Sequence, residues 1–328
     1  MKRLLRAVAC LVLGWGFLAP AMAASQDRYE LPEPYLAWEK AYLRAFPQLQ
    51  AVMDAMVKTT VAQLKEPEQD VLHNRVCSAL VYKMAVDLKL PGDTQRLALI
   101  ADLLHNIHKE EKTAVLTSGQ VMEQSTQAVS RLRAAGYFKA SPRFWSDDAV
   151  LKNAKIGANR SLVHHITGAL EAERIMNEIG GFQRREIDLV QAAIIAHSTG
   201  YWYFRAQVDQ LAGRAEAWRA IYPEPESIVD QLAHDADLIS QFVPESVVPD
   251  GSKWRLLAKN RWGAKGAREE AHVVYYVFQR LFEEAKTDVG RQLAREQWDV
   301  IRPQLAGIMG LGANDDPIRT MGVPKAFQ

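Results

Sequence analysis

Eight histidines are spread along the 328-residue sequence, and most of them lie among apolar residues. They are His73, His105, His108, His164, His165, His197, His234 and His272. Neutral imidazoles bind divalent metals such as zinc, iron and manganese, and carboxylates complete such sites. A single buried histidine is more often a core residue that bonds a backbone carbonyl, so only the set as a whole carries information about function.

Five segments each bring one potential metal ligand to an apolar helix face. These ligands are His73, His105, His164, His197 and Asp237. Apolar residues follow His73, and precede His105 and His197, at steps of three and four, which places each imidazole on an inward face. Gly168, one turn after His164, would let another helix approach closely. Helical bundles build metal sites in their cores in this way; the alternative is that these histidines are unrelated core residues.

The periodicity predicts an all-α protein. Apolar residues recur at three and four positions through most of the chain, and no alternating run is bounded by hairpin turns. The predicted helices are 36–64, 68–88, 93–112, 118–135, 145–155, 159–179, 184–199, 201–221, 225–242, 266–286 and 289–308.

The helices suggest one metal-binding domain with additions at both ends. Residues 24–67 are expected to form an N-terminal arm and helix, and residues 68–242 the metal-binding domain. Residues 243–328 are expected to be a loop and a C-terminal helical extension packed on the same domain. The stretch 244–266 contains Pro, Gly and Asp and is predicted to be a surface loop.

Residues 1–23 have the pattern of an export signal. Basic residues precede the apolar stretch 7–18, and Ala21-Met22-Ala23 is a typical cleavage site. We expect cleavage after Ala23 and export to the periplasm, with secretion to the medium as the alternative. No membrane span should remain, and Cys77 would be the only cysteine. A buried, inert thiol is therefore expected at Cys77, with no disulfide.

The charge balance limits the classes of partner. Lys and Arg number 40 against 39 Asp and Glu, which gives a formal net charge of +1. No global positive field attracts a nucleic-acid polymer or an anionic membrane, so a small anionic ligand would have to be bound locally. The sequence predicts no oligomeric state.

Residues 98–109, ALIADLLHNIHK, resemble the helix that names the HD superfamily, in which a His-Asp pair ends an apolar helix. Other motifs of the family follow the same order. They are LHNRVCSAL at His73, VHHITGA at His164, AIIAHSTG at His197 and HDADLI at Asp237. The ordered series covers about residues 68–242.

The resemblance implies an HD-like helical bundle that binds a divalent metal, such as Mn, Fe, Zn or Mg, and hydrolyses a nucleotide or another small phosphoester. It implies that His73, His105 and Asp237 bind the first metal, and that His164 and His197 serve a second one. Asp235 is an alternative to Asp237, since both lie near the expected place.

The sequence departs from the family at the doublet, which reads His105-Asn106. An amide is neutral and cannot bridge two cations as a carboxylate does. Asn106 would then be a weak ligand or a neighbour of the site. Lys109 and Arg75 are candidates for binding phosphate, and solvated helix charges are the alternative. Three classes stay open: a metal-dependent phosphohydrolase, a non-catalytic protein that binds a metal, an anion or a protein partner, and a purely helical scaffold.

Overall fold

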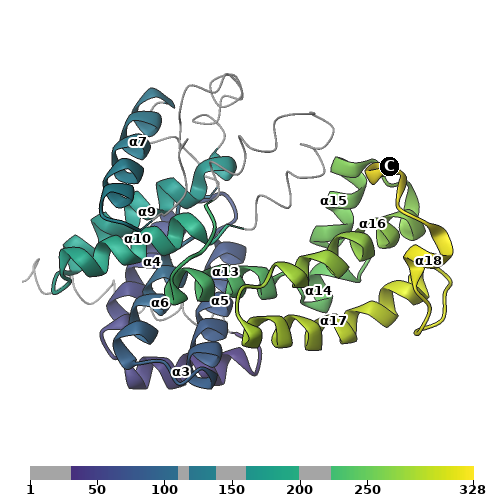
Figure 1. Ribbon diagram of the computed structural model, residues 1–328, viewed down its shortest axis with the longest axis horizontal. Helices are drawn as coiled ribbons and strands as arrows, with labels where there is room; N and C mark the ends of the chain where they lie inside the picture. The colour runs from purple at the N-terminus through teal and green to yellow at the C-terminus, as the bar shows by residue number, and fades with distance from the viewer. Residues whose placement is uncertain (1–30, 110–117, 138–159, 199–222) are drawn as a thin grey trace, which may run out of the picture.

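The computed structural model describes residues 31–109, 118–137, 160–198 and 223–328, and these residues form helices and no strand (Figure 1). The all-α prediction is confirmed. The α-helices are α3 (Tyr35–Ala45), α4 (Leu49–Gln63), α5 (Pro67–Asp87), α6 (Gly92–Leu104), α7 (Ser118–Ala134), α9 (Arg160–Ile179), α10 (Arg184–Ala196), α13 (Ile228–Ser240), α14 (Pro244–Val247), α15 (Lys253–Trp262), α16 (Gly266–Leu281), α17 (Asp288–Ile308) and α18 (Pro317–Met321). Short 3-10 helices follow at η3 (Phe282–Glu284) and η4 (Lys325–Phe327).

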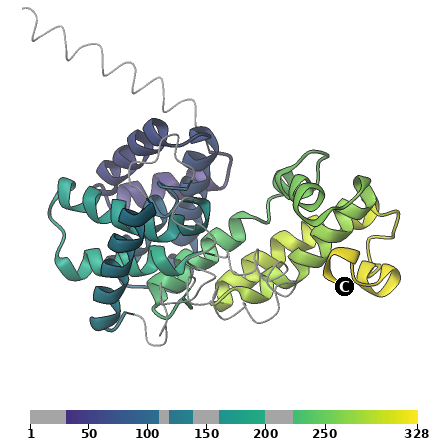
Figure 2. The ribbon, with the colours of Figure 1, turned by 90° about the horizontal axis from the view of Figure 1, so that it is seen from above.

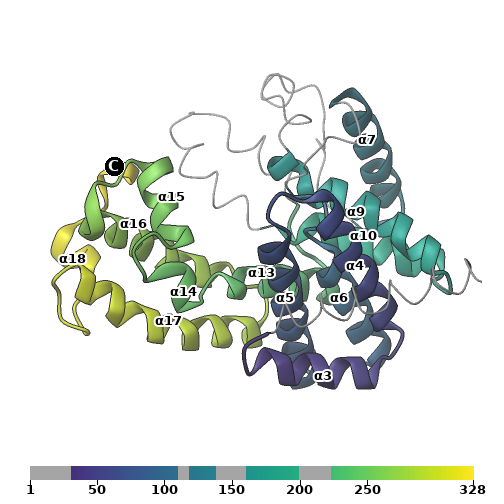
Figure 3. The same ribbon diagram turned by 180° about the vertical axis from the view of Figure 1, so that it is seen from behind.

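The helices form two groups that α13 connects. Figures 1 and 3 show α3 to α10 on one side, α14 to α18 on the other, and α13 between them. Figure 2 shows the same division from above. Helix α13 packs against α5, α6 and α10 of the first group and against α17 of the second. Residues of α13 therefore stand where both groups can contribute to one site.

The hydrophobic core continues from one group into the other. Leu80 of α5 and Ile100 of α6 belong to the same buried cluster as Phe278 of α16 and Trp298 of α17. Phe242, which follows α13, joins the two parts, and its ring centroid lies 4.8 Å from that of Phe278. Burial of large side chains on both sides of Phe242 holds the C-terminal helices against the rest of the chain.

Asp235 provides a polar connection at the same junction. Its carboxylate accepts hydrogen bonds from the backbone N–H of Lys286 (2.7 Å) and from the N–H and hydroxyl of Thr287 (2.8 and 2.7 Å). A side chain at Gly290 would collide with this carboxylate, because a Cβ there would lie 2.8 Å from its Cγ. Asp235 thus fixes the N-terminus of α17 on α13, and buried polar groups satisfied in this way make the connection specific.

The predicted helix 36–64 is wrong in one respect, because the chain forms two helices there. Helix α3 ends at Ala45, and α4 begins at Leu49. Pro47 explains the break: its ring disfavours the helical conformation of the preceding residue, and Phe46 is indeed outside the helical region at φ −134° and ψ 74°.

The predicted helix 93–112 also ends early, at Leu104. Residues 105–108 form turns instead. Helix α9 crosses here so closely that a Cβ on Gly168 would lie 2.8 Å from the carbonyl oxygen of His105. The close approach expected at Gly168 is present, and this tertiary contact accompanies the end of the helix.

The surface loop predicted over 244–266 is wrong. Residues 244–247 and 253–262 form α14 and α15, and Trp254 is buried. Ser252 occupies the N-cap position of α15, and Gly263 ends the helix in the left-handed conformation at φ 69°. Arg255 and Glu270 form a buried ion pair that joins α15 to α16, with an Nη2–Oε2 distance of 2.9 Å. Helix α18 was not predicted either.

The other predicted helices that lie in the described ranges are present, with ends that differ by a few residues. The predictions for 1–23, 145–155 and 201–221, and most of the N-terminal arm, fall outside the described residues. Among the helices that are described, none combines the length and apolar character needed to cross a membrane.

Candidate metal centre

Three of the predicted ligands meet where α5, α6 and α13 pack together. Nε2 of His73 lies 3.1 Å from Oδ1 of Asp237 and 3.2 Å from Nε2 of His105. His73 lies within α5, His105 directly follows α6, and Asp237 lies in the last turns of α13. Three helices thus direct one imidazole or carboxylate each at a common point, as expected for a metal site in a helical bundle.

Cys77 belongs to the same cluster. One ligand atom from each of His73, Cys77, His105 and Asp237 lies within 4.8 Å of all the others, and only His73 is partly exposed. The thiol is buried, as the sequence predicted, but its position beside three metal-ligand types gives it a potential role that the sequence interpretation missed. It lies one helical turn after His73, so both side chains share a face of α5.

The ring nitrogens of His105 have distinct roles. Nδ1 lies 2.6 Å from the carbonyl oxygen of Asp102, which can only accept, so Nδ1 carries the proton. Nε2 of the neutral ring then has a free electron pair, which is the state that binds a metal. In the structure, Nδ2 of Asn106 lies 2.9 Å from this Nε2 and donates a hydrogen bond to its lone pair.

The second predicted pair of histidines adjoins the cluster. The ring centroid of His197 lies 4.7 Å from that of His105 and 5.3 Å from that of His164. Nδ1 of His197 donates to the carbonyl oxygen of Ile194 at 2.5 Å. Its Nε2 is buried and has no hydrogen-bond partner among the described residues, and the same is true of Oδ1 of Asn106.

Burial controls the protonation of these groups. Desolvation lowers the pKa of His73, although Asp237 opposes the shift, and it lowers the pKa of His105 further. Desolvation also lowers the pKa of His197 to about 4. Burial alone would raise the pKa of Asp237, but the hydrogen bond and charge of His73 hold that pKa well below its usual value. Neutral imidazoles beside an ionised carboxylate can bind a cation without first losing protons.

Asp102 is a further buried acid near the cluster. Neither of its carboxyl oxygens has a hydrogen-bond partner among the described residues. Desolvation, followed by the charge of Asp237, raises its pKa well above the usual value. Desolvation and then the charges of Asp102 and Asp237 likewise raise the pKa of Cys77. Without a cation, this part of the core therefore favours the uncharged forms of both groups.

The structure separates the two predicted phosphate-binding residues. The guanidinium of Arg75 forms a two-point contact with Glu39 of α3, with Nε–Oε1 at 2.7 Å and Nη2–Oε2 at 2.5 Å. Arg75 therefore joins two helices. Lys109 lines a cavity beside His73. Nε2 of His108, the next histidine after His105, lies 3.8 Å from Oε2 of Glu171.

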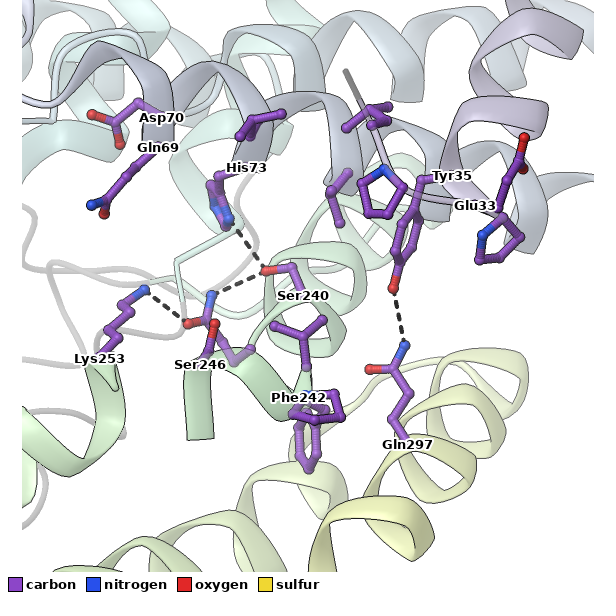
Figure 4. Close-up of a pocket in the computed structure, with 18 of the residues that line it drawn as sticks. Glu33, Tyr35, Gln69, Asp70, His73, Ser240, Phe242, Ser246, Lys253 and Gln297 are labelled. Atoms are coloured by element: carbon purple, nitrogen blue, oxygen red, sulfur yellow. Dashed lines mark hydrogen bonds between the residues drawn. The ribbon is translucent and has the colours of Figure 1, made fainter. Parts of the chain in front are cut away.

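The cavity beside His73 has a volume of about 930 Å³. In Figure 4, Lys253, Ser240 and His73 lie close together at one end and Tyr35 lies at the other. Nζ of Lys253 donates to Oε1 of Gln241 at 3.1 Å, and Ser240 Oγ is 3.4 Å from His73 Nδ1. Desolvation and the charge of Lys109 lower the pKa of Lys253 to about 8.

Lys253, Ser240 and Gln241 were missed by the sequence interpretation. Lys253 lies in the stretch predicted to be a surface loop, and no sequence signal places that stretch beside His73. Ser240 and Gln241 follow Asp237 by one helical turn, so their spacing alone could have indicated them. Gln241 Nε2 donates to the carbonyl oxygen of Asp237 at 3.1 Å and helps to hold the end of α13.

Comparisons with family models, with curated proteins and with solved structures found no match to this chain.

Proposed function

We propose that this protein binds a divalent metal with His73, His105 and Asp237 and uses it to hydrolyse a phosphoester, as the resemblance to the HD superfamily implies. The observation that carries the proposal is the convergence of these three side chains from three helices, with their ligand atoms within 4.8 Å of one another. The unpartnered buried atoms of His197 and Asn106 support it, because such atoms are rare unless a ligand or water satisfies them.

The donor set favours zinc or iron over magnesium. Two imidazoles and a buried thiol are softer ligands than the oxygens that magnesium prefers. If Cys77 stays outside the coordination sphere, His73, His105 and Asp237 leave a position open for water, as in catalytic zinc sites. If Cys77 binds, four protein ligands close the site, and a closed site is typical of structural zinc.

If the site is catalytic, each of the residues around it has a separate role. A bound divalent ion would lower the pKa of a coordinated water and neutralise charge on the phosphoryl oxygens. The Asp102 carbonyl keeps the proton of His105 on Nδ1, so that Nε2 faces the site. The amide of Asn106 would have to turn so that its oxygen rather than its nitrogen faces that point. Lys109, on the cavity wall, would bind the phosphate as a point charge.

Metal content is the direct test of the proposal. We would measure it by elemental analysis on the full chain after incubation with zinc, iron or manganese. The matched variants are His105→Ala and His272→Ala, since His272 bonds the carbonyl of Gly322, away from the cluster. We expect one or two ions per chain, loss in His105→Ala and retention in His272→Ala. Hydrolysis of 4-nitrophenyl phosphate and its diester would then be assayed. Absence of metal from every sample would refute the proposal.

A non-catalytic metal site is the second candidate, and the amide at Asn106 favours it, because a neutral oxygen binds cations weakly and cannot bridge two of them. Asn106→Asp separates the two functions. Restored or increased hydrolysis in this variant, with metal bound, would indicate a weakened catalytic site. Unchanged activity and unchanged metal content would favour a closed site that includes Cys77.

We also propose that the chain is exported, on the basis of the pattern in residues 1–23. Expression of the full chain in a Gram-negative host, followed by cell fractionation and N-terminal sequencing, tests this directly. A periplasmic product that begins at Ala24 is expected. A cytoplasmic product that begins at Met1 would contradict it.

A further inference from the structure

The cavity beside the metal cluster has two chemically different ends. The end near His73 carries polar groups, among them Lys109, Lys253 and Gln241. The rest of the wall includes the apolar residues Leu31, Pro32, Pro34, Leu72, Val76, Phe242, Val243, Pro244 and Val300, together with polar or charged residues such as Glu33, Tyr35, Glu66, Ser246 and Gln297. Figure 4 shows Phe242 and Tyr35 on this side, away from Lys253. A ligand that matched both ends would combine a polar head with an apolar body.

The polar end is suited to an anion once a metal is bound. Desolvation, and then the charge of Lys109, lower the pKa of Lys253, while the carboxylates of Asp237 and Asp70 offset part of the lysine charge. Glu66 adds a further carboxylate to the cavity wall. A divalent ion on His73 and Asp237 would add two positive charges at the same end. The resulting excess of positive charge in a partly enclosed site attracts an anionic group.

The polar groups near Tyr35 are already engaged. The Tyr35 hydroxyl lies 3.4 Å from the amide nitrogen of Gln297. In its alternative orientation that amide donates to the carbonyl oxygens of Ile239 (3.0 Å) and Phe242 (3.1 Å). A nucleobase lying here would leave several donors and acceptors without partners, which costs free energy. An apolar ligand group placed here has no hydrogen bonds to lose, and its burial is favourable.

We propose that the cavity binds an amphiphilic anion, with a phosphate-like head between Lys109 and Lys253 and an aromatic or aliphatic body along Leu72, Val76 and Val243. The proposal rests on the proposed metal site and narrows its substrate class from phosphoesters in general to esters of apolar alcohols. It also assigns a binding role to the C-terminal helices, because Lys253 begins α15.

Non-hydrolysable probes test the proposal without turnover. Binding of 1-naphthylphosphonate, methylphosphonate and 1-naphthol to the metal-loaded full chain would be measured by isothermal titration calorimetry. We expect the naphthyl probe to bind at least about tenfold more tightly than methylphosphonate, since about 1.4 kcal/mol corresponds to a factor of ten and burial of one ring supplies that much. The neutral naphthol should bind more weakly than the naphthyl anion. Equal affinity for the two phosphonates would overturn the proposal.

Substitutions at Lys253 and Val243 test the polar and the apolar end of the cavity separately. Lys253→Met should weaken both phosphonates about tenfold, and Lys253→Arg should restore most of the loss. Lys259→Met is the matched control, because Lys259 is exposed on the same helix and is not among the residues of the cavity wall. Val243→Thr, which keeps the shape of the side chain, should weaken only the naphthyl probe. Unchanged phosphonate binding in Lys253→Met would overturn the placement of the anionic head between Lys109 and Lys253.

Metal content measured on each sample distinguishes this inference from the proposed function. Protein that holds metal but shows no preference for the naphthyl anion overturns the inference and leaves the metal site standing. Protein that holds no metal overturns both. A loss of metal in Lys253→Met would show that Lys253 supports the metal ligands through Gln241 and would contradict its assignment as an anion-binding residue.

Discussion

Asp235 and Asp237 lie two residues apart on α13, and both are buried, but their surroundings differ. The carboxylate of Asp235 accepts three hydrogen bonds from Lys286 and Thr287 at the start of α17. The carboxylate of Asp237 faces His73 in a region where His197 Nε2, Asn106 Oδ1 and both oxygens of Asp102 have no partner among the described residues.

The difference separates a structural polar site from a functional one. Natural cores satisfy their buried polar groups, so several unsatisfied atoms in one place require an explanation. At the α13–α17 junction the protein itself satisfies the charge. Around His105 the described residues leave several atoms without partners, and a cation bound beside them could use the lone pairs of His197 Nε2 and Asn106 Oδ1. The two regions should therefore respond in opposite ways to mutation, to pH and to metal.

The largest expected effect is on the free energy of unfolding, and it arises at Asp235 in the α13–α17 junction. Asp235→Ala removes the acceptor of the Lys286 and Thr287 N–H groups just before α17 and should lower the free energy of unfolding by about 3 kcal/mol. Urea denaturation of the metal-free protein measures it. Asp237→Ala is the matched control and should cost less than about 1 kcal/mol without metal, yet abolish metal binding. Equal losses in both variants would erase the distinction between the two sites.

The next effect concerns pH. His73, His105 and His197 have pKa values lowered by burial, the last to about 4, so the unfolded chain binds protons more readily than the folded one. Their stabilising contribution is present above about pH 6.5, the unfolded value, and is lost as pH falls toward the folded value. Each group that titrates changes stability by up to about 1.4 kcal/mol per pH unit.

We therefore expect His197 alone to cost the metal-free protein about 2 kcal/mol between pH 7 and pH 5. His73 and His105 add to the loss, and the raised pKa of Asp102 opposes part of it. Urea titrations at the two pH values measure the loss. His197→Gln should reduce the slope. Bound zinc should steepen it, because the ion keeps the folded-state imidazoles deprotonated while the unfolded chain still takes up protons. A slope that His197→Gln does not change would show that His197 does not contribute to acid stability.

Much of this site could be predicted from sequence because its members lie inside strongly periodic helices. His73, His105 and Asp237 each lie on or beside an apolar stripe, and the helix face follows from the spacing alone. The choice between Asp235 and Asp237 could not be made in this way. Both lie in the same largely apolar stretch of α13, and only the position of α17 shows which one is used at the junction.

The C-terminal helices were harder to predict. Pro, Gly and Asp between residues 244 and 266 are typical of a loop, yet Ser252 and Gly263 bound a helix there. Its burial depends on contacts with α16, which no local signal indicates. Cys77 was missed as a site residue for a similar reason: a buried thiol is usually inert, and its nearness to His105 and Asp237 is a tertiary fact.

A smaller effect is expected at the helix crossing that positions His105. Gly168→Ala places a Cβ 2.8 Å from the His105 carbonyl oxygen, so α9 or the turn after α6 must shift, at a cost of about 1 to 2 kcal/mol. Gly307→Ala is the control, because nothing lies within 4 Å of a Cβ there, and it should stabilise helix α17 by about 0.5 to 1 kcal/mol. Metal affinity should fall in the first variant alone. Retention of full affinity by Gly168→Ala would show that the site tolerates movement of the α6 end.

The smallest effect distinguishes the two basic residues that the sequence proposed for phosphate binding. Arg75 contacts Glu39 at two points, so it resembles Asp235 in being satisfied by the protein. Arg75→Lys loses the two-point geometry and should lower stability by about 1 kcal/mol without changing KM for 4-nitrophenyl phosphate. Lys109→Met should raise KM several-fold with little loss of stability, because one cation at the cavity wall is removed. If Arg75→Lys raised KM and Lys109→Met did not, phosphate would bind on the α3 side of α5, and the cavity beside His73 would not be the substrate site.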